Sequence, residues 1–356
     1  MKIEQAAYAF RIKGQPVSCI GFGHGHINHT LKITTDIGTA YILQKINKYV
    51  FKDPVKVMSN ASAVTEHICK KIDDPRLALH FIPTVDGKYY YRDPEGEFWK
   101  MCEFVHGFCL DTPETEQDFY ESALAFGRFQ QLLTDFPADQ LYETIPNFHN
   151  TPDRFRQLKE SIASDNVGRA AGVKAEIDYA LSLEERGSVL QRMLEAGQLP
   201  LRVTHNDTKL NNVMLDQDTR KALCVLDLDT VMPGLSVHDF GDSIRFGAAT
   251  AAEDEPDATK MKLDLHLFEV YTKGFLEVAT ALTDAEIDML PMGAFTMTLE
   301  VGIRFLKDYL DGDIYFKTQY PEHNLIRART QLALAADMIT KWDDMVAIVA
   351  KQRKTQ

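Results

Sequence analysis

Hydrophobic and polar residues alternate along the N-terminal part of the chain with the period of two that is typical of β-strands. Short apolar runs bounded by Gly, Asp or Asn predict strands at 17–20, 30–34, 40–43, 88–91 and 98–101. A helix-compatible stretch at 54–70 interrupts this series, and the turn residues at 93–96 separate the last two strands. The pattern therefore predicts a small antiparallel sheet accompanied by one helix.

Beyond Gly107 the apolar residues recur at the helical spacing of about 3.6 residues, for example within 119–133, 177–181 and 295–309. A chain of 356 residues is also longer than one core usually supports. We therefore predict an α+β chain of two lobes, a strand-rich one at 1–103 and a mainly helical one at 104–356. The segment 102–107 is the expected hinge, and a ligand is expected in the cleft between lobes.

Composition excludes several classes of function. Hydrophobic residues make up 45% and charged residues 26%, as in ordinary globular proteins. The formal charge of −13 argues against a nucleic-acid or anionic-membrane partner, since either would select clustered Lys and Arg. An acidic chain can still bind phosphate, but only where positive charge is concentrated locally. Small molecules are therefore the expected partners, and the chain is expected to be a monomer or a weak homo-oligomer.

Cysteine usage and the N-terminus indicate a cytoplasmic protein. The five cysteines are odd in number and show no Cys-x-x-Cys spacing, so neither a disulfide framework nor a zinc site is indicated. Glu4, Arg11 and Lys13 interrupt the apolar residues of the N-terminus, which therefore does not resemble a signal peptide. No apolar run approaches the ~20 residues that a spanning helix needs.

The segment 205–212, with the pattern His-x-Asp-x-Lys-x-x-Asn, has the spacing of a phosphoryl-transfer loop. Asp207 is the predicted catalytic base or hydroxyl orienter, His205 shapes the loop through hydrogen bonds, and Lys209 binds the γ-phosphate. The alternative is that His205 and Asp207 form only a polar turn. Lys209 and Asn212 match the kinase loop in type and spacing, and this favours the catalytic interpretation.

Three oxygen-bearing residues are the predicted Mg²⁺ ligands. Asn212 belongs to the loop, and Asp227 follows the apolar run 222–226, which predicts a buried strand. Alternation along that strand would bring Asp229 to the same face, so Asp229 is either an additional ligand or a turn-forming carboxylate. Asp239, in an Asp-Phe-Gly triplet, follows a Pro-Gly turn instead of a strand. We therefore predict that it braces the catalytic loop.

A glycine-rich segment at 21–28 lies between the first two strands and is the candidate nucleotide lid, with Gly23 and Gly25 allowing close approach to phosphates. On its own such a segment is more often an ordinary hairpin turn. His26 in this segment is either a phosphate or substrate contact or an exposed turn residue. Glu103 and Val105 of the hinge are further candidates for nucleotide binding.

The lysine that kinases usually place on the third strand is missing or displaced. Gln44 occupies that position, and Lys45 is on the opposite face of the strand. Either Gln44 acts as a neutral donor, or a bulge turns Lys45 inward. The usual ion pair with a helix glutamate, for which Glu66 is the candidate, is therefore open to question.

These motifs resemble those of the aminoglycoside phosphotransferase and choline kinase superfamily, whose loop reads His-x-Asp-x-x-x-x-Asn before a strand ending in Asp. Within it, the resemblance is closest to the bacterial N-acetylhexosamine 1-kinases and extends over nearly the whole chain. The segments that carry it are 25–28, 201–212, 239–247 and 312–316. The resemblance implies a bilobal, protein-kinase-like fold with a β-sheet N-lobe that binds ATP and Mg²⁺.

The resemblance also implies a reaction: transfer of phosphate from ATP to the anomeric hydroxyl of N-acetylglucosamine or N-acetylgalactosamine. The sugar is then expected beside Asp207, near four candidate residues: His26, His149, Arg304 and Tyr315. Alternatively, Arg304 forms a surface row with Glu300 and Asp308, and His149 lies beside a helix cap. The residues also leave open a kinase of choline, homoserine, an aminoglycoside or another sugar, a glycosyltransferase with an Asp-x-Asp metal pair, and a pseudokinase.

Overall fold

The computed structural model describes residues 5–23 and 28–353. The chain forms two compact units, and each contains more than one segment. The first comprises 1–109, 132–146 and 212–233, and the second comprises 110–131, 147–211 and 234–356. These units do not coincide with the predicted ranges 1–103 and 104–356, because two later segments of the chain pack with the N-terminal sheet.

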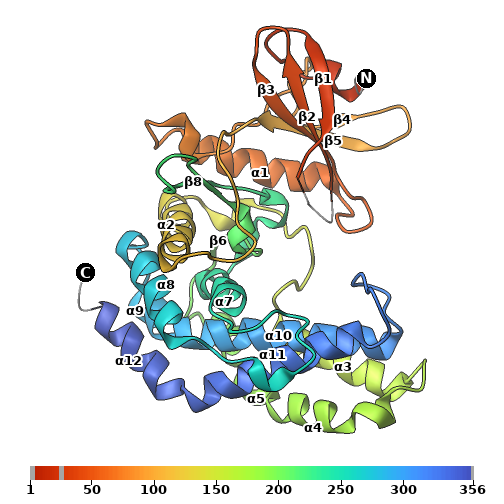
Figure 1. The fold of residues 1–356 in the computed structure, drawn as a ribbon, viewed down its shortest axis with the longest axis vertical. Coiled ribbons are helices and arrows are strands. Elements are labelled where there is room, and N and C mark those ends of the chain that lie inside the picture. Colours follow the sequence, from red (N-terminus) through yellow and green to blue (C-terminus); the bar gives the residue numbers. More distant parts are fainter. Residues whose placement is uncertain (1–4, 24–27, 354–356) are drawn as a thin grey trace. The chain divides into compact units, whose positions relative to one another are not determined.

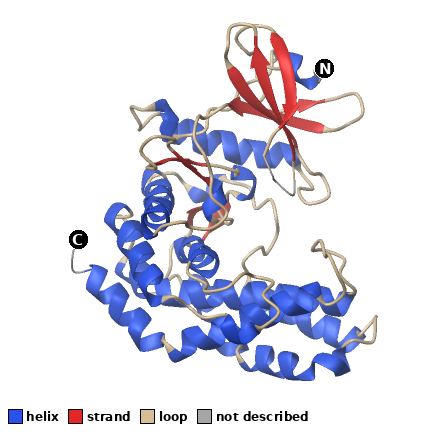
Figure 2. Cartoon of the chain, viewed as in Figure 1, coloured by secondary structure: helices blue, strands red, loops and turns tan. Residues whose placement is uncertain are grey.

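Figures 1 and 2 show the elements of both units. The strands are β1 (Pro16–Gly21), β2 (His29–Thr35), β3 (Ala40–Lys45), β4 (Tyr91–Arg92), β5 (Phe98–Glu103), β6 (Arg202–Thr204), β7 (Val213–Leu215), β8 (Ala222–Val225) and β9 (Met232–Gly234). The α-helices are α1 (Pro54–Cys69), α2 (Glu116–Leu132), α3 (Thr151–Ser164), α4 (Lys174–Ser182), α5 (Glu184–Gly187), α6 (Val189–Glu195), α7 (Ser236–Gly247), α8 (Leu265–Val278), α9 (Asp284–Asp288), α10 (Leu290–Asp311), α11 (His323–Thr340) and α12 (Trp342–Arg353). None of these described helices combines the length and apolar character needed to cross a membrane.

The first unit is built on a five-stranded antiparallel sheet with the order β1-β2-β3-β5-β4. One face of this sheet carries Ile33, Leu43 and Met101, which are fully buried against the 3₁₀ helix η1 (Gln5–Ala9). The alternation in the sequence produces this arrangement, because successive side chains of a strand point to opposite faces. The predicted antiparallel sheet is confirmed, but the expected strand at 88–91 is reduced to the two residues of β4.

Helix α1 lies within the same unit and begins where the sequence predicts. Asp53 caps it by accepting a hydrogen bond from the backbone N–H of Lys56 at 3.2 Å, and Pro54 occupies the first turn. The buried Asn60 of α1 donates to the carbonyl oxygens of Tyr142 and Val231 at 2.8 and 2.9 Å. Asn60 therefore ties α1 to the later segments 132–146 and 212–233 of its unit.

Strands β7 and β8 form a hairpin in the first unit, with Val213 opposite Val225. The backbone N–H of Leu226 donates to the carbonyl oxygen of Asn212 at 2.8 Å. The hairpin thus places Asn212 next to the residue that precedes Asp227.

The second unit is helical, and α10 is its central element. It packs against α3, α7 and α11. Gly241 of α7 and Gly293 of α10 allow these helices to approach closely, since a Cβ atom at Gly241 would collide with the carbonyl oxygen of Gly293. Phe240 of α7 contacts Phe268, Tyr271 and Phe275 of α8, with ring centroids 5.4–5.9 Å apart. This packing fixes α7, and α7 in turn supports the loop that follows β6.

Candidate active site

The loop after β6 contains buried residues and a partly exposed tip. His205 and Thr208 are fully buried, while the side chains of Asp207 and Lys209 are partly exposed. The His205 ring meets Phe126 and Phe129 edge-on, and its Nδ1 accepts a hydrogen bond from the Asp207 backbone N–H at 3.2 Å. His205 therefore shapes the loop, as the sequence predicts.

Asp239 holds this loop from the first turn of α7. Its Oδ1 accepts from the Asn206 backbone N–H at 2.8 Å, and its Oδ2 accepts from the His205 backbone N–H at 2.8 Å and from Gln130 at 2.6 Å. Burial raises the pKa of Asp239, and the nearby His205 and these hydrogen bonds oppose that rise. The predicted bracing role of Asp239 is confirmed.

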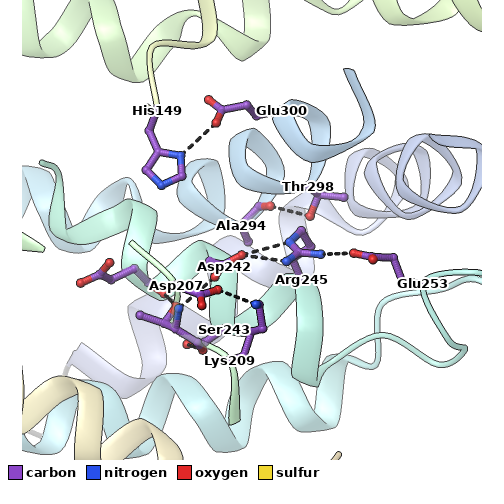
Figure 3. Close-up of polar contacts among 12 residues, drawn as sticks. His149, Asp207, Lys209, Asp242, Ser243, Arg245, Glu253, Ala294, Thr298 and Glu300 are labelled. Carbon is purple, nitrogen blue, oxygen red and sulfur yellow. Dashed lines mark hydrogen bonds and ion pairs between the residues drawn. The ribbon is translucent and has the colours of Figure 1, made fainter. Parts of the chain in front are cut away.

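Lys209 and Asp207 form an ion pair with Nζ and Oδ1 2.7 Å apart (Figure 3). Burial alone would lower the pKa of Lys209, but the charges of Asp207 and Asp242 outweigh it and raise the pKa. Lys209 is therefore a cation at neutral pH. A carboxylate and a cation stand side by side at the tip of the loop, which is the pairing that a phosphate-transfer site requires.

Asp242 adds a second support from α7. Its Oδ2 accepts from the Thr208 backbone N–H at 3.0 Å. Its Oδ1 accepts from the guanidinium group of Arg245 at 2.9 Å (Figure 3). Arg245 also binds Glu253 at 2.8 Å. The neighbouring Ser243 donates to the Thr208 carbonyl oxygen at 2.8 Å. The loop motif alone does not predict that Asp242, Ser243 and Arg245 support the loop. The segment 239–247 nevertheless carries part of the family resemblance.

A further buried cluster in the second unit centres on Glu300 of α10. Its Oε1 binds His149 Nδ1 at 2.9 Å (Figure 3). Its Oε2 accepts from the Thr151 hydroxyl at 3.0 Å. The other ring nitrogen of His149, Nε2, is buried and has no hydrogen-bond partner among the described residues. A buried polar atom in this condition is costly unless a ligand satisfies it. His149 is therefore a candidate ligand contact and not simply a cap neighbour.

Burial alone would raise the pKa of Glu300, but the charge and hydrogen bond of His149, with Arg154 and Arg304, lower it to about 2. The unfolded chain then binds more protons than the folded chain between pH 4.5 and 2, so this contribution to stability is complete above that window and is lost as pH falls. As pH falls from about 7 to about 3.5, the free energy of unfolding of the wild type should decrease. We expect the decrease to be about 1.4 kcal/mol smaller in Glu300→Gln, which lacks this carboxylate.

Urea denaturation at the two pH values measures this difference. Glu185→Gln, at an exposed carboxylate, is the matched control and should follow the wild type. Equal losses for the wild type and Glu300→Gln would contradict the assignment.

Arg304 and Tyr315 lie near this cluster. The Arg304 guanidinium carbon is 5.5, 5.8 and 5.4 Å from the ring centroids of Phe148, Tyr315 and Phe316. The alternative role of Arg304, a surface row with Glu300 and Asp308, is wrong because both carboxylates are buried and have other partners. Asp308 accepts from the backbone N–H groups of Ile314, Tyr315 and Phe316. Three of the four predicted substrate residues thus gather in one region, and His26 lies outside the described residues.

In the first unit, the β7–β8 hairpin fixes the two principal candidates for the metal site. Asp227 follows β8 with φ 53° and ψ 63°, a left-handed conformation that Asp tolerates better than most residues. Asn212 precedes β7 at the same end of this antiparallel ladder. An amide oxygen and a carboxylate match the oxygen ligands that Mg²⁺ prefers when phosphates complete its coordination. The described residues contain no group of three or more His, Cys, Asp or Glu that could hold a metal ion.

Asp229 has partners other than a metal. The chain enters a 3₁₀ turn (Leu228–Thr230) directly after Asp227, so the predicted strand alternation does not apply. Its Oδ1 forms an ion pair with Lys100 of β5, and its Oδ2 accepts from the Asn28 side chain at 2.7 Å. Both carboxylate oxygens are therefore engaged by protein donors, and Asp229 fits the second predicted role, a structural carboxylate of a turn.

The strand register shows which faces of β3 Gln44 and Lys45 occupy. The β3 register is unbroken from Ala40 to Lys45 against β2 and from Tyr41 to Lys45 against β5, so no bulge turns Lys45 to the other face. Gln44 donates to the Thr30 hydroxyl at 3.0 Å. Glu66 is exposed on α1 and hydrogen-bonds Tyr89, so the expected pair between Glu66 and a strand lysine is absent from the described residues.

The remaining nucleotide candidates belong to the ends of the sheet. Gly23 follows β1 with φ 74°, which favours glycine, and Gly25 lies outside the described residues. The Glu103 backbone N–H donates to the His80 carbonyl oxygen at 2.9 Å, so it is already used within the unit. Val105, two residues further along, remains a predicted contact.

Comparison with known proteins places this architecture in a family. Residues 18–272 match the model of the phosphotransferase enzyme family, and the chain therefore belongs to that family. Its fold is that of the kinase-like members, with an antiparallel sheet in one unit and helices in the other.

Solved structures show the same fold at low sequence identity. A microcompartment-associated aminopropanol kinase has a TM-score of 0.63 at 16% identity, covering 96% of this chain and 97% of its own. An aminoglycoside phosphotransferase from Alicyclobacillus acidocaldarius has a TM-score of 0.61 at 13% identity, with coverages of 100% and 98%. A choline kinase from Cryptosporidium parvum Iowa II has a TM-score of 0.56 at 13% identity, with coverages of 96% and 94%.

Proposed function

We propose that this protein is an ATP-dependent kinase that phosphorylates the anomeric hydroxyl of N-acetylhexosamines, N-acetylglucosamine or N-acetylgalactosamine, to give the sugar 1-phosphate. The observation that carries the proposal is the character of the cluster around Glu300. It combines a carboxylate paired with His149, a buried imidazole nitrogen without a partner among the described residues, and the guanidinium group of Arg304 against aromatic rings. These groups suit an uncharged acceptor rich in hydroxyl and amide groups.

The cluster and the catalytic loop belong to the same unit. Burial would raise the pKa of Asp242, but Arg245, with smaller effects from the charges of Lys209 and His149, lowers it. His149 and Lys209 therefore both lie near Asp242. Figure 3 shows His149 and Glu300 in the same region as Asp207 and Lys209. An acceptor bound at the cluster would therefore lie near the Asp207 carboxylate, which supports acceptor phosphorylation by this loop.

In the proposed reaction, Asp207 accepts the proton of the anomeric hydroxyl as its oxygen forms a bond to the γ-phosphorus of ATP. The bond between that phosphorus and the β,γ-bridging oxygen breaks, and ADP leaves. Lys209 would stabilise the charge on the transferred phosphoryl group. Asn212 and Asp227 would hold Mg²⁺, which neutralises phosphate charge when bound. An amicoumacin kinase of similar fold, with a TM-score of 0.62 at 14% identity, was solved with AMP-PNP and Ca²⁺.

The main rival is a kinase of the same fold that acts on a cationic acceptor, choline or an aminoglycoside, or on the zwitterion homoserine. A polycationic acceptor would require carboxylates without other partners. Glu300 is paired with His149, Asp207 with Lys209 and Asp242 with Arg245. The cationic Arg304 would also repel such an acceptor. This charge distribution favours a neutral sugar.

A glycosyltransferase and a pseudokinase are both less well supported. A glycosyltransferase with an Asp227-x-Asp229 metal pair conflicts with the family match and with the engagement of both Asp229 oxygens. A pseudokinase would be expected to lack part of the reactive set, whereas Asp207, Lys209, Asn212 and Asp227 are all present.

The test is an ATP-consumption screen over N-acetylglucosamine, N-acetylgalactosamine, galactose, choline and homoserine, with NMR assignment of the phosphorylated position. We expect turnover with the N-acetylhexosamines and a phosphate on the anomeric oxygen. Preferential turnover of choline or homoserine, or phosphate on another hydroxyl, would refute the proposal.

A further inference from the structure

A buried lysine on β5 stands beside the position where the strand lysine of a kinase is expected. Gln44 of β3 pairs with Lys100 of β5 across the antiparallel ladder. Residues directly opposite in such a pair project to the same face of the sheet, with Cβ atoms about 5 Å apart. Lys100 therefore shares a face with Gln44, while Leu43 and Met101 face the opposite side, towards the apolar core.

Lys100 is held in this position at considerable cost. Its side chain is only 3% exposed, and an ammonium group is among the most expensive groups to remove from water. Burial would lower its pKa, but the charges of Asp229 and Asp227 outweigh that effect and raise it. A raised pKa keeps the charge on Lys100 throughout the neutral range. A permanently charged lysine thus lies near Asp227, the candidate Mg²⁺ ligand of the same unit.

The partner of Lys100 also binds Asn28, the residue before β2. Asp229 binds Lys100 through Oδ1 and the Asn28 side chain through Oδ2. Asn28 also accepts a hydrogen bond from the Asn47 backbone N–H at 3.0 Å through its own side-chain oxygen. Asp229 therefore connects the lysine, the beginning of β2 and the residues that follow β3. This arrangement fixes the position of the ammonium group. A cation that binds a ligand needs a fixed position, whereas a cation that is only buried does not.

We propose that Lys100 is the cation that pairs with the nucleotide phosphates in this protein, and that Asp229 positions it. The pair would replace the third-strand lysine and helix glutamate of protein kinases, with the lysine moved one strand sideways and the carboxylate moved from α1 to the turn after Asp227. This proposal explains why a glutamine can occupy position 44 and why Glu66 can be exposed. Neither residue is needed for the lysine–glutamate pair of protein kinases. The inference rests on the proposed function only in taking ATP as the ligand.

The test separates phosphate recognition from structural support by titrating two ligands, MgATP and adenosine, into the intact protein by calorimetry. For Lys100→Gln we expect affinity for MgATP to fall at least tenfold while affinity for adenosine changes less than twofold. Lys52→Gln, at an exposed lysine of the same unit, should leave both unchanged. An unchanged MgATP affinity in Lys100→Gln, or equal losses for the two ligands, would overturn the assignment.

The second part of the test places a lysine on the third strand. In Gln44→Lys/Lys100→Gln the charge lies on the same face one strand away, so we expect part of the lost MgATP affinity to return. Lys100→Gln alone leaves Asp229 buried without its cation, which is destabilising. If that variant does not fold, Lys100→Gln/Asp229→Asn, which removes both charges, replaces it in the comparison of ligands. Failure of the transferred lysine to restore any affinity counts against the proposal.

These titrations contain no acceptor, so they test the role of Lys100 independently of the identity of the acceptor. A wild type that binds MgATP but phosphorylates no N-acetylhexosamine refutes the proposed acceptor and leaves the result for Lys100 intact. A wild type that binds no MgATP overturns both proposals.

Discussion

Replacement of Asp207 by Asn is expected to lower kcat by about 10²- to 10⁴-fold while affinity for MgATP changes little, because the amide has nearly the same shape but cannot accept the proton of the acceptor hydroxyl. The Asp207 carboxylate is also the partner of Lys209 at 2.7 Å, so the substitution weakens the placement of the cation that we propose to stabilise the transferred phosphoryl group. Steady-state kinetics with saturating ATP and acceptor measures kcat, and calorimetry measures nucleotide affinity.

Asp218→Asn is the control for this experiment, since Asp218 is exposed in the turn between β7 and β8. It should retain wild-type turnover. If Asp207→Asn also turns over at nearly the wild-type rate, Asp207 is not the base. If its MgATP affinity collapses together with kcat, the residue acts mainly in nucleotide binding.

Local patterns of the sequence predict most of the individual elements. Alternation locates β1, β2, β3 and β5 within a residue or two, and Pro54 marks the start of α1. The same patterns fail where an element is short or ends early. The apolar run 222–226 predicts a strand through Leu226, but β8 ends at Val225 and Asp227 adopts a left-handed conformation. Asp229 therefore lies in a turn, and strand alternation could not locate its partners.

Lys100 shows why the ion pairs of the site are harder to predict. The sequence shows a single charged residue within the apolar run 98–102, which is a usable signal because charges inside buried strands need partners. The partner, Asp229, is 129 residues away, and the register of β5 against β3 depends on tertiary pairing. Nothing local indicates that Lys100 lies directly opposite Gln44.

The Glu300 cluster depends on long-range packing in the same way. His149 and Glu300 are 151 residues apart, and helical spacing alone suggests that Glu300 pairs with Arg304 on its own helix. The packing of α10 against α3 brings Thr151 to Glu300 instead, together with His149 from the preceding loop. Burial then decides the pairing, because a buried carboxylate takes the partners that satisfy both of its oxygens.

Replacement of Asp239 by Asn is expected to destabilise the protein by about 2–4 kcal/mol and to lower kcat by at least about tenfold. Asp239 accepts from three donors, the backbone N–H groups of His205 and Asn206 and the side chain of Gln130. In Asn one of the two oxygens becomes an NH₂ group, which would face a donor in a buried site. The loop must then shift, and Asp207 moves with it.

Urea denaturation and steady-state kinetics of Asp239→Asn test this role together. Because Asp239 is buried below the loop and contacts its backbone, stability and turnover should fall in the same variant, whereas Asp207→Asn should lose turnover with little loss of stability. Asp218→Asn again serves as the exposed control. Unchanged turnover in a destabilised Asp239→Asn would show that the loop keeps its catalytic geometry without the brace. A loss of turnover at full stability would instead assign Asp239 a direct part in the chemistry.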